Sequence, residues 1–272
     1  QLAAHRRFGT DAWIVGFPGP SAAAPPAETT TVRIAEAELE IRTRWRTSRG
    51  TLVRRTHNTP GYYDWAIESP VKDLRRDLPG WCEVALADPR TVDLADLRAA
   101  IAGTGEDGLV TAFVGKLFFD FVANAREGGS TQAVFDFADD AAFLAQFHDR
   151  YVAWMTGMAE AILTGTGARV LFIENGYASL GIESPALYRR WDLPVIAAVA
   201  RLAHARGALL HVHQHGPSTA VLGDLADAGV DLVDPLERPP GGDVTDLAAV
   251  KRAHGGRLAL RGNIHAHEVL LR

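Results

Sequence analysis

The sequence predicts an α/β fold built on a parallel sheet. Short apolar segments alternate with longer amphipathic segments along most of the chain, which is the pattern of successive βα units. Polar and ionisable residues follow several of the apolar segments, so the predicted strands end at a common polar edge. At 272 residues, of which 47% are hydrophobic, the chain is long enough to bury a large core, and we expect residues 1–272 to form one domain.

The apolar segments predict six strands, and the amphipathic segments between them predict five helices. Six strands are too few for a closed eight-stranded barrel, so either the sheet is open or strands of a barrel are missing. Ser184 and Pro185 suit the N-cap and the first residue of one helix. The predicted strands are residues 12–17, 109–115, 169–174, 208–213, 230–236 and 257–262, and the predicted helices are residues 94–102, 141–163, 185–205, 219–228 and 244–254.

Residues 32–57 follow a different pattern. Apolar and polar residues alternate on both sides of Ser48-Arg49-Gly50, which predicts an antiparallel β-hairpin that lies outside the parallel sheet. The arginines between Arg42 and Arg55 are interleaved with other residues rather than grouped in a block. We therefore expect them on a solvent-exposed face of the hairpin.

Composition and charge exclude several classes of function. The 28 basic and 33 acidic residues give a net charge of −5, which provides no basic surface for nucleic acid. Cys82 is the single cysteine, which excludes an internal disulfide framework and a cysteine-rich zinc module and fits a reducing compartment. No apolar run is long enough to span a membrane, and no signal-peptide pattern opens the chain. We expect a cytoplasmic protein that acts on a small molecule and binds neither nucleic acid nor membranes.

The most informative stretch is His211-Val212-His213-Gln214-His215-Gly216, at the end of a predicted strand. Because side chains alternate along a strand, His211 and His213 should face one side and Val212 the surrounding helices. Two neutral imidazoles on one face form half of a metal site, and nitrogen ligands suit zinc. The alternative is that both are core histidines bonded to backbone carbonyls. His215 is expected in the following loop, as a polar substrate contact.

Carboxylate and amide side chains follow the neighbouring strands. Glu237 comes just after one strand, where it would complete a metal site of two histidines and one carboxylate or act as a general base; alternatively it pairs with Arg238 at the surface. Asp234 is interpreted as the start of a turn. Further candidates, each of which also suits a capping or packing role, are Glu174 as a catalytic carboxylate and Asn175, Tyr177 and Asn263 as substrate contacts.

Several short motifs, in their order and spacing, resemble those of the uroporphyrinogen decarboxylase superfamily. That superfamily comprises haem-pathway decarboxylases and methylcobamide or corrinoid methyltransferases on TIM-type barrels. The resemblance implies a TIM-type (β/α)8 barrel whose first and last strands are absent from this chain. The motifs are Phe8-Gly9-Thr10-Asp11, Ile182-Glu183-Ser184-Pro185 with Tyr188 and Leu193-Pro194, the histidine run at 211–216, Gly229-Val230-Asp231 with Pro235-Leu236-Glu237, and Gly262-Asn263-Ile264.

The two branches of the superfamily imply different residues. The methyltransferase branch holds zinc through His-x-Cys after the fifth strand and a distant cysteine; the matching tripeptide here is His211-Val212-His213, so the sulfur ligand is replaced by a second imidazole. The decarboxylase branch carries an aspartate just after the strand that here ends in Phe17-Pro18-Gly19, where this chain has no carboxylate. The resemblance therefore favours methyl transfer.

The leading hypothesis is zinc-dependent methyl transfer involving a corrinoid or thiol acceptor, with a corrinoid protein as a partner. Zinc would be held by His211 and His213, and Glu237 would either bind the metal or remove the acceptor's proton. One alternative is decarboxylation of a porphyrinogen-like tetrapyrrole. Another is a barrel that binds a tetrapyrrole or corrinoid without turnover.

Overall fold

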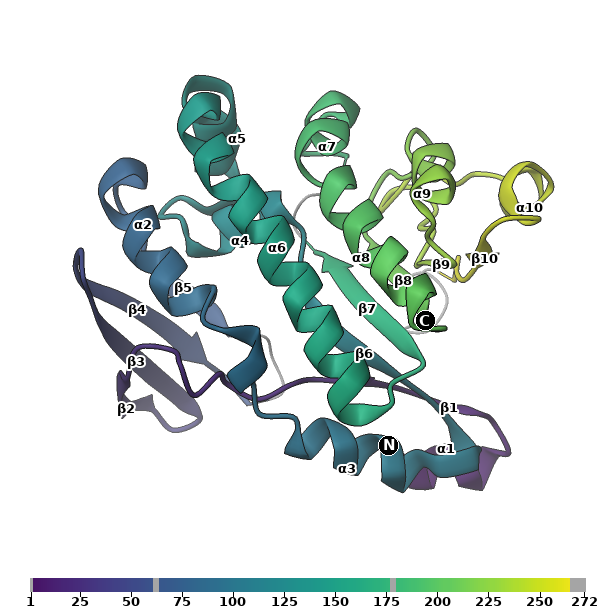
Figure 1. Ribbon diagram of the computed structural model, residues 1–272, viewed down its shortest axis with the longest axis horizontal. Coiled ribbons are helices and arrows are strands. Elements are labelled where there is room, and N and C mark those ends of the chain that lie inside the picture. Colours follow the sequence, from purple (N-terminus) through teal and green to yellow (C-terminus); the bar gives the residue numbers. More distant parts are fainter. Residues whose placement is uncertain (1, 61–63, 177–179, 265–272) are drawn as a thin grey trace.

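The computed structural model describes residues 2–60, 64–176 and 180–264, and it contains two separate sheets (Figure 1). The larger sheet has six strands in the order β1-β6-β7-β8-β9-β10, and every neighbouring pair is parallel. The sheet is curled into part of a TIM-type barrel, so the predicted strands, their common direction and their order are confirmed. Their bounds are β1 Ala12–Gly16, β6 Gly108–Lys116, β7 Val170–Asn175, β8 Leu209–Gln214, β9 Leu232–Asp234 and β10 Ala259–Leu260.

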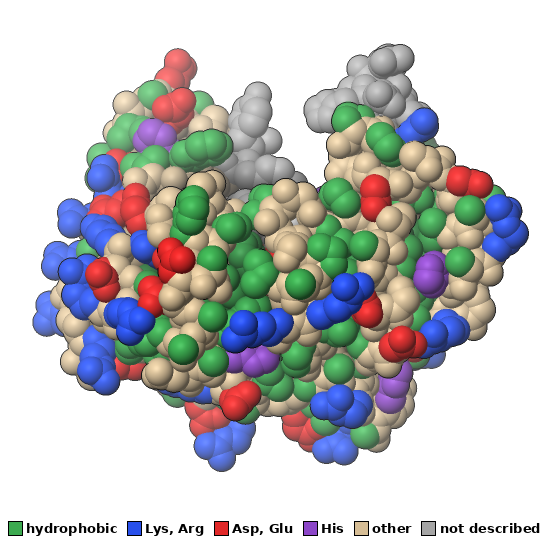
Figure 2. Space-filling model, turned by 90° about the horizontal axis from the view of Figure 1, so that it is seen from above, with side chains coloured by type: hydrophobic (Ala, Val, Ile, Leu, Met, Phe, Trp, Pro, Cys, Tyr) green, Lys and Arg blue, Asp and Glu red, His purple; other side chains and the backbone are tan. Residues whose placement is uncertain are grey.

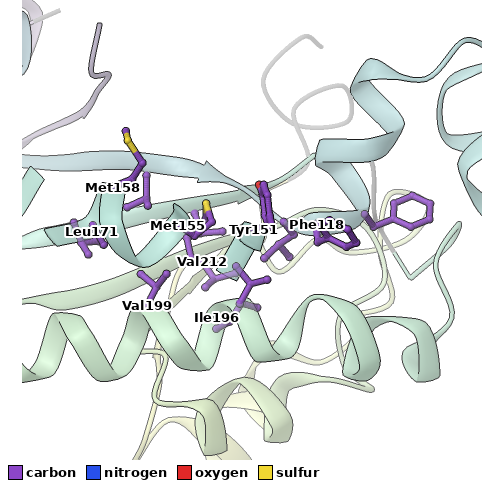
Figure 3. Close-up of a cluster of buried hydrophobic side chains, with 14 of the residues drawn as sticks. Phe118, Tyr151, Met155, Met158, Leu171, Ile196, Val199 and Val212 are labelled. Carbon is purple, nitrogen blue, oxygen red and sulfur yellow. The ribbon is translucent and has the colours of Figure 1, made fainter. Parts of the chain in front are cut away.

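Helices cover the outer face of this sheet. The long helix α6 (Ala141–Thr166) and helix α8 (Leu193–Ala205) pack against each other and lie across β6, β7 and β8. Figure 3 shows Met155 of α6, Val199 of α8 and Val212 of β8 in one buried cluster. Val212 is fully buried there, as the alternation of the strand predicts. This packing leaves His211 and His213 on the opposite, inner face of the sheet.

The amphipathic segment 185–205 was expected to be one helix, but it forms two. Helix α7 (Pro185–Trp191) ends before Asp192, and α8 begins at Leu193. Pro194 lacks a backbone N–H and its ring excludes the preceding helical turn, which is why the chain restarts a helix there. The predicted N-cap is confirmed, because the Ser184 side chain accepts a hydrogen bond from Leu187 N at 3.2 Å.

The remaining helices agree in part with the sequence-based expectation. The helices predicted at 94–102, 219–228 and 244–254 are present, although the last two begin three residues later than expected. Four further helices were not predicted. The confirmed set is α3 Ala95–Thr104, α9 Leu222–Ala228 and α10 Leu247–His254, and the additional set is α1 Leu2–Phe8, α2 Leu74–Ala85, α4 Phe118–Ala125 and α5 Gly129–Asp139.

The expected hairpin is the centre of a larger antiparallel sheet. Strands β3 (Glu38–Thr47) and β4 (Gly50–Asn58) pair around the predicted turn, and β2 (Ala27–Ala35) and β5 (Trp65–Glu68) extend the sheet on either side. The prediction was therefore two strands short, and its first residue, Val32, lies in β2, all of whose residues are exposed. The arginines at 42, 44 and 46 are exposed, as expected, whereas Arg54 and Arg55 are only partly exposed because their strand β4 packs against α2 and β3. Figure 2 shows basic side chains gathered on the left, over this sheet.

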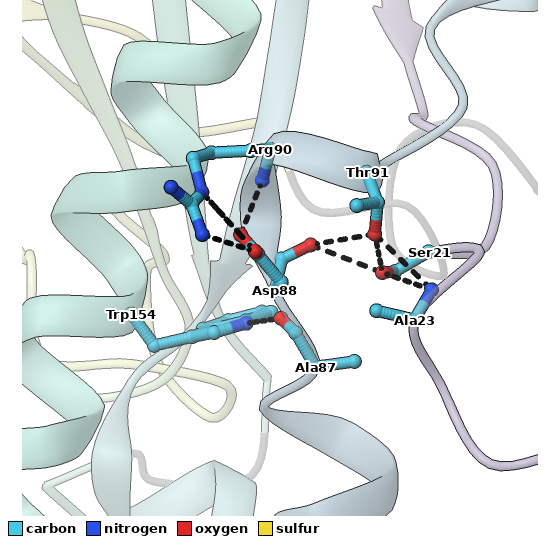
Figure 4. Close-up of polar contacts among 7 residues, drawn as sticks. All are labelled: Ser21, Ala23, Ala87, Asp88, Arg90, Thr91 and Trp154. Carbon is cyan, nitrogen blue, oxygen red and sulfur yellow. Dashed lines mark hydrogen bonds and ion pairs between the residues drawn. The ribbon is translucent and has the colours of Figure 1, made fainter.

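Hydrogen bonds fix the loop that leads from β1 to the four-stranded sheet (Figure 4). Ser21 Oγ donates to Asp88 O at 3.0 Å, and Ala23 N donates to Thr91 Oγ1 at 3.1 Å. In the same region Trp154 Nε1 of α6 donates to Ala87 O at 2.9 Å. These contacts tie the loop and the short helix η1 (Pro89–Thr91) to α6, so the antiparallel sheet has a defined place beside the barrel strands.

Among the residues that the structure describes, no helix is both long and apolar enough to cross a lipid bilayer.

Close packing of β1 against β6 makes Gly108 sensitive to substitution. A Cβ atom at residue 108 would lie 2.1 Å from Ala12 O, a backbone atom, whereas a Cβ at Gly103 in α3 would meet nothing within 4 Å. We expect Gly108→Ala to lower the free energy of unfolding by about 1–3 kcal/mol. Gly103→Ala should raise it by up to about 1 kcal/mol, because alanine is the better helix former. Urea denaturation of both variants tests this, and equal effects would contradict the described packing.

Candidate functional site

The carboxyl ends of β7, β8 and β9 bring the predicted polar residues side by side. In the strand register Glu174 lies opposite His213, and His213 lies opposite Asp234. Glu237 follows β9, and Asn263 follows β10, at the same edge of the sheet. The expected gathering of these groups where the parallel strands end is therefore confirmed.

Asp234 is the centre of this arrangement. Its Oδ1 is hydrogen-bonded to His211 Nε2 at 2.6 Å and to His213 Nδ1 at 2.8 Å. Its Oδ2 accepts from Arg261 Nη1 at 3.1 Å. Asp234 and His211 are both buried. From the sequence we expected Asp234 only to begin a turn. Its role as the shared partner of two imidazoles was not predicted.

The charges of this group follow from its burial and hydrogen bonds. Burial alone would raise the pKa of Asp234, but the hydrogen bonds from His211 and His213 hold that pKa well below its ordinary value. Burial lowers the pKa of His211, against the opposing effect of Asp234. Asp234 is therefore ionised at neutral pH, and His211 is neutral and donates its Nε2–H to the carboxylate.

Aromatic rings enclose the buried end of the group. The Trp13 and Phe172 rings have their centroids 5.0 and 4.8 Å from that of His211. The guanidinium of Arg261 lies over the Trp13 ring, 3.6 Å from the ring centroid. Among the described residues, His211 Nδ1 has no hydrogen-bond partner, so the ring is held by the hydrogen bond of Nε2 to Asp234 and by packing against Trp13 and Phe172.

The other nitrogen of His213 points to His215. The two Nε2 atoms are 2.9 Å apart. His215 Nδ1 is 3.3 Å from Glu237 Oε2, which also accepts from Gly216 N at 2.6 Å. A continuous polar chain thus runs from the buried His211 through Asp234, His213 and His215 to Glu237.

Asp234 and Glu237 determine whether the facing Nε2 atoms of His213 and His215 carry a proton. If His213 Nδ1 donates to Asp234 and His215 Nδ1 donates to Glu237, both Nε2 atoms of the neutral rings present lone pairs to each other. Two lone pairs at 2.9 Å repel, so either one Nε2 carries a proton and donates it to the other, or a metal ion beside the pair binds both. Carboxylates that orient metal-binding imidazoles through the opposite ring nitrogen are usual in zinc sites.

This donor set fits zinc in part. His213 and His215 supply two oriented imidazole nitrogens, which are zinc ligands by type. Within the described ranges, however, no group of three or more His, Cys, Asp or Glu side chains is arranged to hold a metal ion. The arrangement also differs from the expected set of His211, His213 and Glu237, because His211 Nε2 is hydrogen-bonded to Asp234. A metal at His213 and His215 would need further ligands from elsewhere.

The other predicted residues have varied surroundings. Glu174 pairs with Lys116, with Lys116 Nζ 3.2 Å from Glu174 Oε1, and both are partly exposed. Asn175 is buried and donates from Nδ2 to Gln214 Oε1 at 2.8 Å. Asn263 donates from Nδ2 to Val244 O at 3.0 Å. Tyr177 lies outside the described residues. Glu174 therefore adjoins the histidines, whereas Asn175 and Asn263 join elements together.

Sequence reasoning gave no role to three buried acidic residues, Asp120, Glu183 and Asp192, although Glu183 lies in one of the quoted motifs. Asp120 Oδ2 accepts from Gly176 N at 2.8 Å, and Asp192 Oδ1 accepts from Phe119 N at 3.0 Å. All three side chains are buried. Burial raises the pKa of both Glu183 and Asp192, and their proximity raises that of Glu183 further. Glu183 therefore keeps its proton at neutral pH.

Comparison with known proteins places the chain in a family. A family model described as "Uroporphyrinogen decarboxylase (URO-D)" matches residues 119–272, which is more than half of the chain. The chain belongs to the uroporphyrinogen decarboxylase family. The resemblance found in the sequence motifs of this URO-D family member is thereby confirmed, and the match includes all of the candidate site residues.

One solved structure, a methyltransferase from Methanosarcina mazei, shares the fold of this URO-D family member. The TM-score is 0.54 and the sequence identity 18%, over 76% of this chain. The match spans 58% of the length of that methyltransferase. No curated protein matches the chain in sequence.

The raised pKa of Glu183 predicts a pH dependence of stability. A folded-state pKa above the unfolded value near 4.3 means that the unfolded chain loses this proton first, so the contribution of Glu183 to stability falls as the pH rises above that value. Glu183→Gln should remove this loss, and the free energy of unfolding of the variant relative to wild type should rise by up to roughly 1.4 kcal/mol per pH unit. Urea denaturation from pH 5 to 8 measures it. Glu106→Gln, at an exposed residue, is the control. Parallel profiles for wild type and Glu183→Gln would contradict the assignment.

Proposed function

We propose that this protein catalyses methyl transfer involving a corrinoid or thiol acceptor, with zinc bound by His213 and His215. The observation that carries the proposal is the pair of Nε2 atoms that face each other at 2.9 Å, each on a ring whose Nδ1 lies against a carboxylate. His213 stands at the position where the methyltransferase branch has the cysteine of His-x-Cys. The proposal replaces His211 by His215 as a ligand, because His211 Nε2 is hydrogen-bonded to buried Asp234.

The family match is consistent with either branch, and the description of the structural neighbour supports methyl transfer. The chain belongs to the URO-D family, and the structurally similar protein from Methanosarcina mazei is described as a methyltransferase. The residue after β1 also supports it. Phe17 is exposed where the decarboxylase branch carries an aspartate, so the group that would stabilise a protonated pyrrole is missing there.

Each side chain of the polar chain has a distinct role in this proposal. Asp234 accepts from His213 Nδ1, which fixes the ring and makes Nε2 the better donor to a cation. Glu237 orients His215 in the same way. His211 and Arg261 hold Asp234 in place from the buried side. The two ligand nitrogens are therefore positioned before a substrate arrives.

Zinc bound at these nitrogens would lower the pKa of a thiol acceptor, so that the nucleophilic thiolate is available at neutral pH. The thiol proton needs an acceptor. Glu237 is partly exposed and uses Oε2 for its contacts with His215 and Gly216, which leaves Oε1 to accept that proton. Glu174, on the neighbouring strand, is the second carboxylate at this edge.

Metal binding tests the ligand assignment. Wild-type protein should bind about one zinc ion per chain, and His213→Ala and His215→Ala should each weaken binding by at least tenfold, because each removes one of two protein ligands. His213→Cys should retain zinc. His204→Ala, at a partly exposed histidine bonded to Asp231, is the matched control and should bind as wild type does. Zinc titration with a competing chelator measures all of these. Absence of stoichiometric zinc, or unchanged binding by His213→Ala, would refute the assignment.

Activity assays separate methyl transfer from decarboxylation. Zinc-loaded protein with methylcobalamin and a small thiol should release demethylated cobalamin, seen by its absorbance under anaerobic conditions, and His213→Ala should abolish the release. Anaerobic incubation with uroporphyrinogen should leave the substrate unchanged. Appearance of less-carboxylated porphyrinogens at an enzymatic rate, without methyl transfer, would favour the decarboxylase alternative instead.

A further inference from the structure

A cavity of about 450 Å³ lies between the four-stranded sheet and the barrel strands. It is lined by residues of β4, α2, α4, α6 and the carboxyl end of β6, so it lies where the two sheets of the fold meet. Lys116, which pairs with Glu174, lines it on the side of the candidate active site. The side chains that matter for its chemistry are Arg54, Trp81, Phe113, Lys116, Phe121 and Trp154.

Arg54 is a partly buried cation in the wall of this cavity. Its Nη2 donates to Asn124 O at 3.1 Å, and its guanidinium lies 5.2 Å from the centroid of the Trp81 ring. Burial lowers the pKa of Arg54, and no charged neighbour opposes that effect. Among the described residues, no carboxylate forms an ion pair with it. One hydrogen bond to a neutral oxygen leaves most of its five N–H donors available.

Among the described residues, neither of the neighbouring charges forms an ion pair with Arg54. Asp64, which also lines the cavity, accepts from Asn58 Nδ2 at 2.6 Å. Arg55, the next residue of β4, pairs with Glu40 at 2.7 Å outside this cavity. Taking a charge out of water is costly unless an opposite charge compensates it. Arg54 can therefore take one negative charge from a ligand, in a wall that also holds the Asp64 carboxylate.

Apart from the charged residues Asp64 and Lys116 and the polar Thr56 and Asn124, the wall beside Arg54 is apolar and aromatic. A second cavity, of about 400 Å³, shares Phe113, Gly115 and Trp154 with the first and extends it along Phe17 and Trp45. The Phe17 and Phe113 rings are 5.1 Å apart at their centroids. A ligand that fills this space must therefore present a flat apolar body beside its charged group.

We propose that this cavity is a binding site for an organic monocarboxylate with an aromatic or similarly flat apolar body. The guanidinium of Arg54 binds the carboxylate, for which its planar fork is suited. Arg54, which has no ion-pair partner among the described residues, matches one negative charge, whereas a phosphate monoester would bring a second charge into a wall that already holds the Asp64 carboxylate and whose Lys116 pairs with Glu174. The apolar body lies against Phe113 and Trp154. The inference does not depend on which reaction the histidines carry out, since it concerns binding alone.

Calorimetric titration of the wild-type protein with 2-naphthoate tests the proposal, with its neutral amide, 2-naphthamide, as the matched ligand. Naphthoate should bind at least tenfold more tightly than the amide, because only the carboxylate compensates Arg54. Acetate should bind at least tenfold more weakly than naphthoate, because it leaves the aromatic wall uncovered. Naphthoate that binds no better than the amide, or does not bind, would overturn the proposal without any variant.

Variants of adjacent arginines locate the site. Arg54→Met should weaken naphthoate binding at least tenfold, whereas Arg55→Met, outside the cavity, should leave it unchanged. If Arg54→Met does not fold, as judged by thermal unfolding, Arg54→Lys keeps the charge but loses the fork and should weaken binding by a smaller factor. Equal losses in Arg54→Met and Arg55→Met, or unchanged binding in Arg54→Lys and Arg54→Met alike, would overturn the assignment. Zinc binding and methyl transfer enter none of these measurements.

Discussion

A single buried carboxylate organises the polar edge of this barrel. Asp234 ends β9, and its Oδ1 is shared by two imidazoles of the neighbouring strand, His211 at 2.6 Å and His213 at 2.8 Å. Such a carboxylate is stable in the interior only because hydrogen bonds and Arg261 compensate the loss of water. The arrangement in turn fixes which nitrogen of His213 faces outward. His213 Nε2 is thereby directed at His215, whose Nδ1 in turn contacts Glu237.

The parallel sheet was predictable because its strands are short apolar runs in a regular alternation with helices. The same reasoning missed the break at Asp192, since the amphipathic pattern continues through Pro194 while the backbone hydrogen bonds do not. It also missed β2 as a separate strand, because all of its residues are exposed and only Val32 and Ile34 are large and apolar. Pairing with β3 forms this strand, and pairing is a property of two segments that no single segment reveals.

The candidate site, like the fold, was predictable only in part. Alternation along β8 placed His211 and His213 on one face, and that is where they lie. The role of Asp234 was not predictable, because it depends on the register between β8 and β9, which brings His213 opposite it. The contact between His213 and His215 depends on the path of the chain after the strand. The sequence did not distinguish Arg54 from the other arginines of the hairpin. Only the packing of β4 against α2 and α4 separates it from the exposed ones.

We infer that Asp234 fixes the protonation pattern of His211 and His213. Long-range ¹H–¹⁵N spectra of the histidine side chains at neutral pH measure it most directly. We expect His213 to carry a proton on Nδ1 and His211 to be neutral with its proton on Nε2, and we expect Asp234→Asn to change the His213 pattern. A His213 ring that is unprotonated at Nδ1 in the wild-type protein would contradict the account.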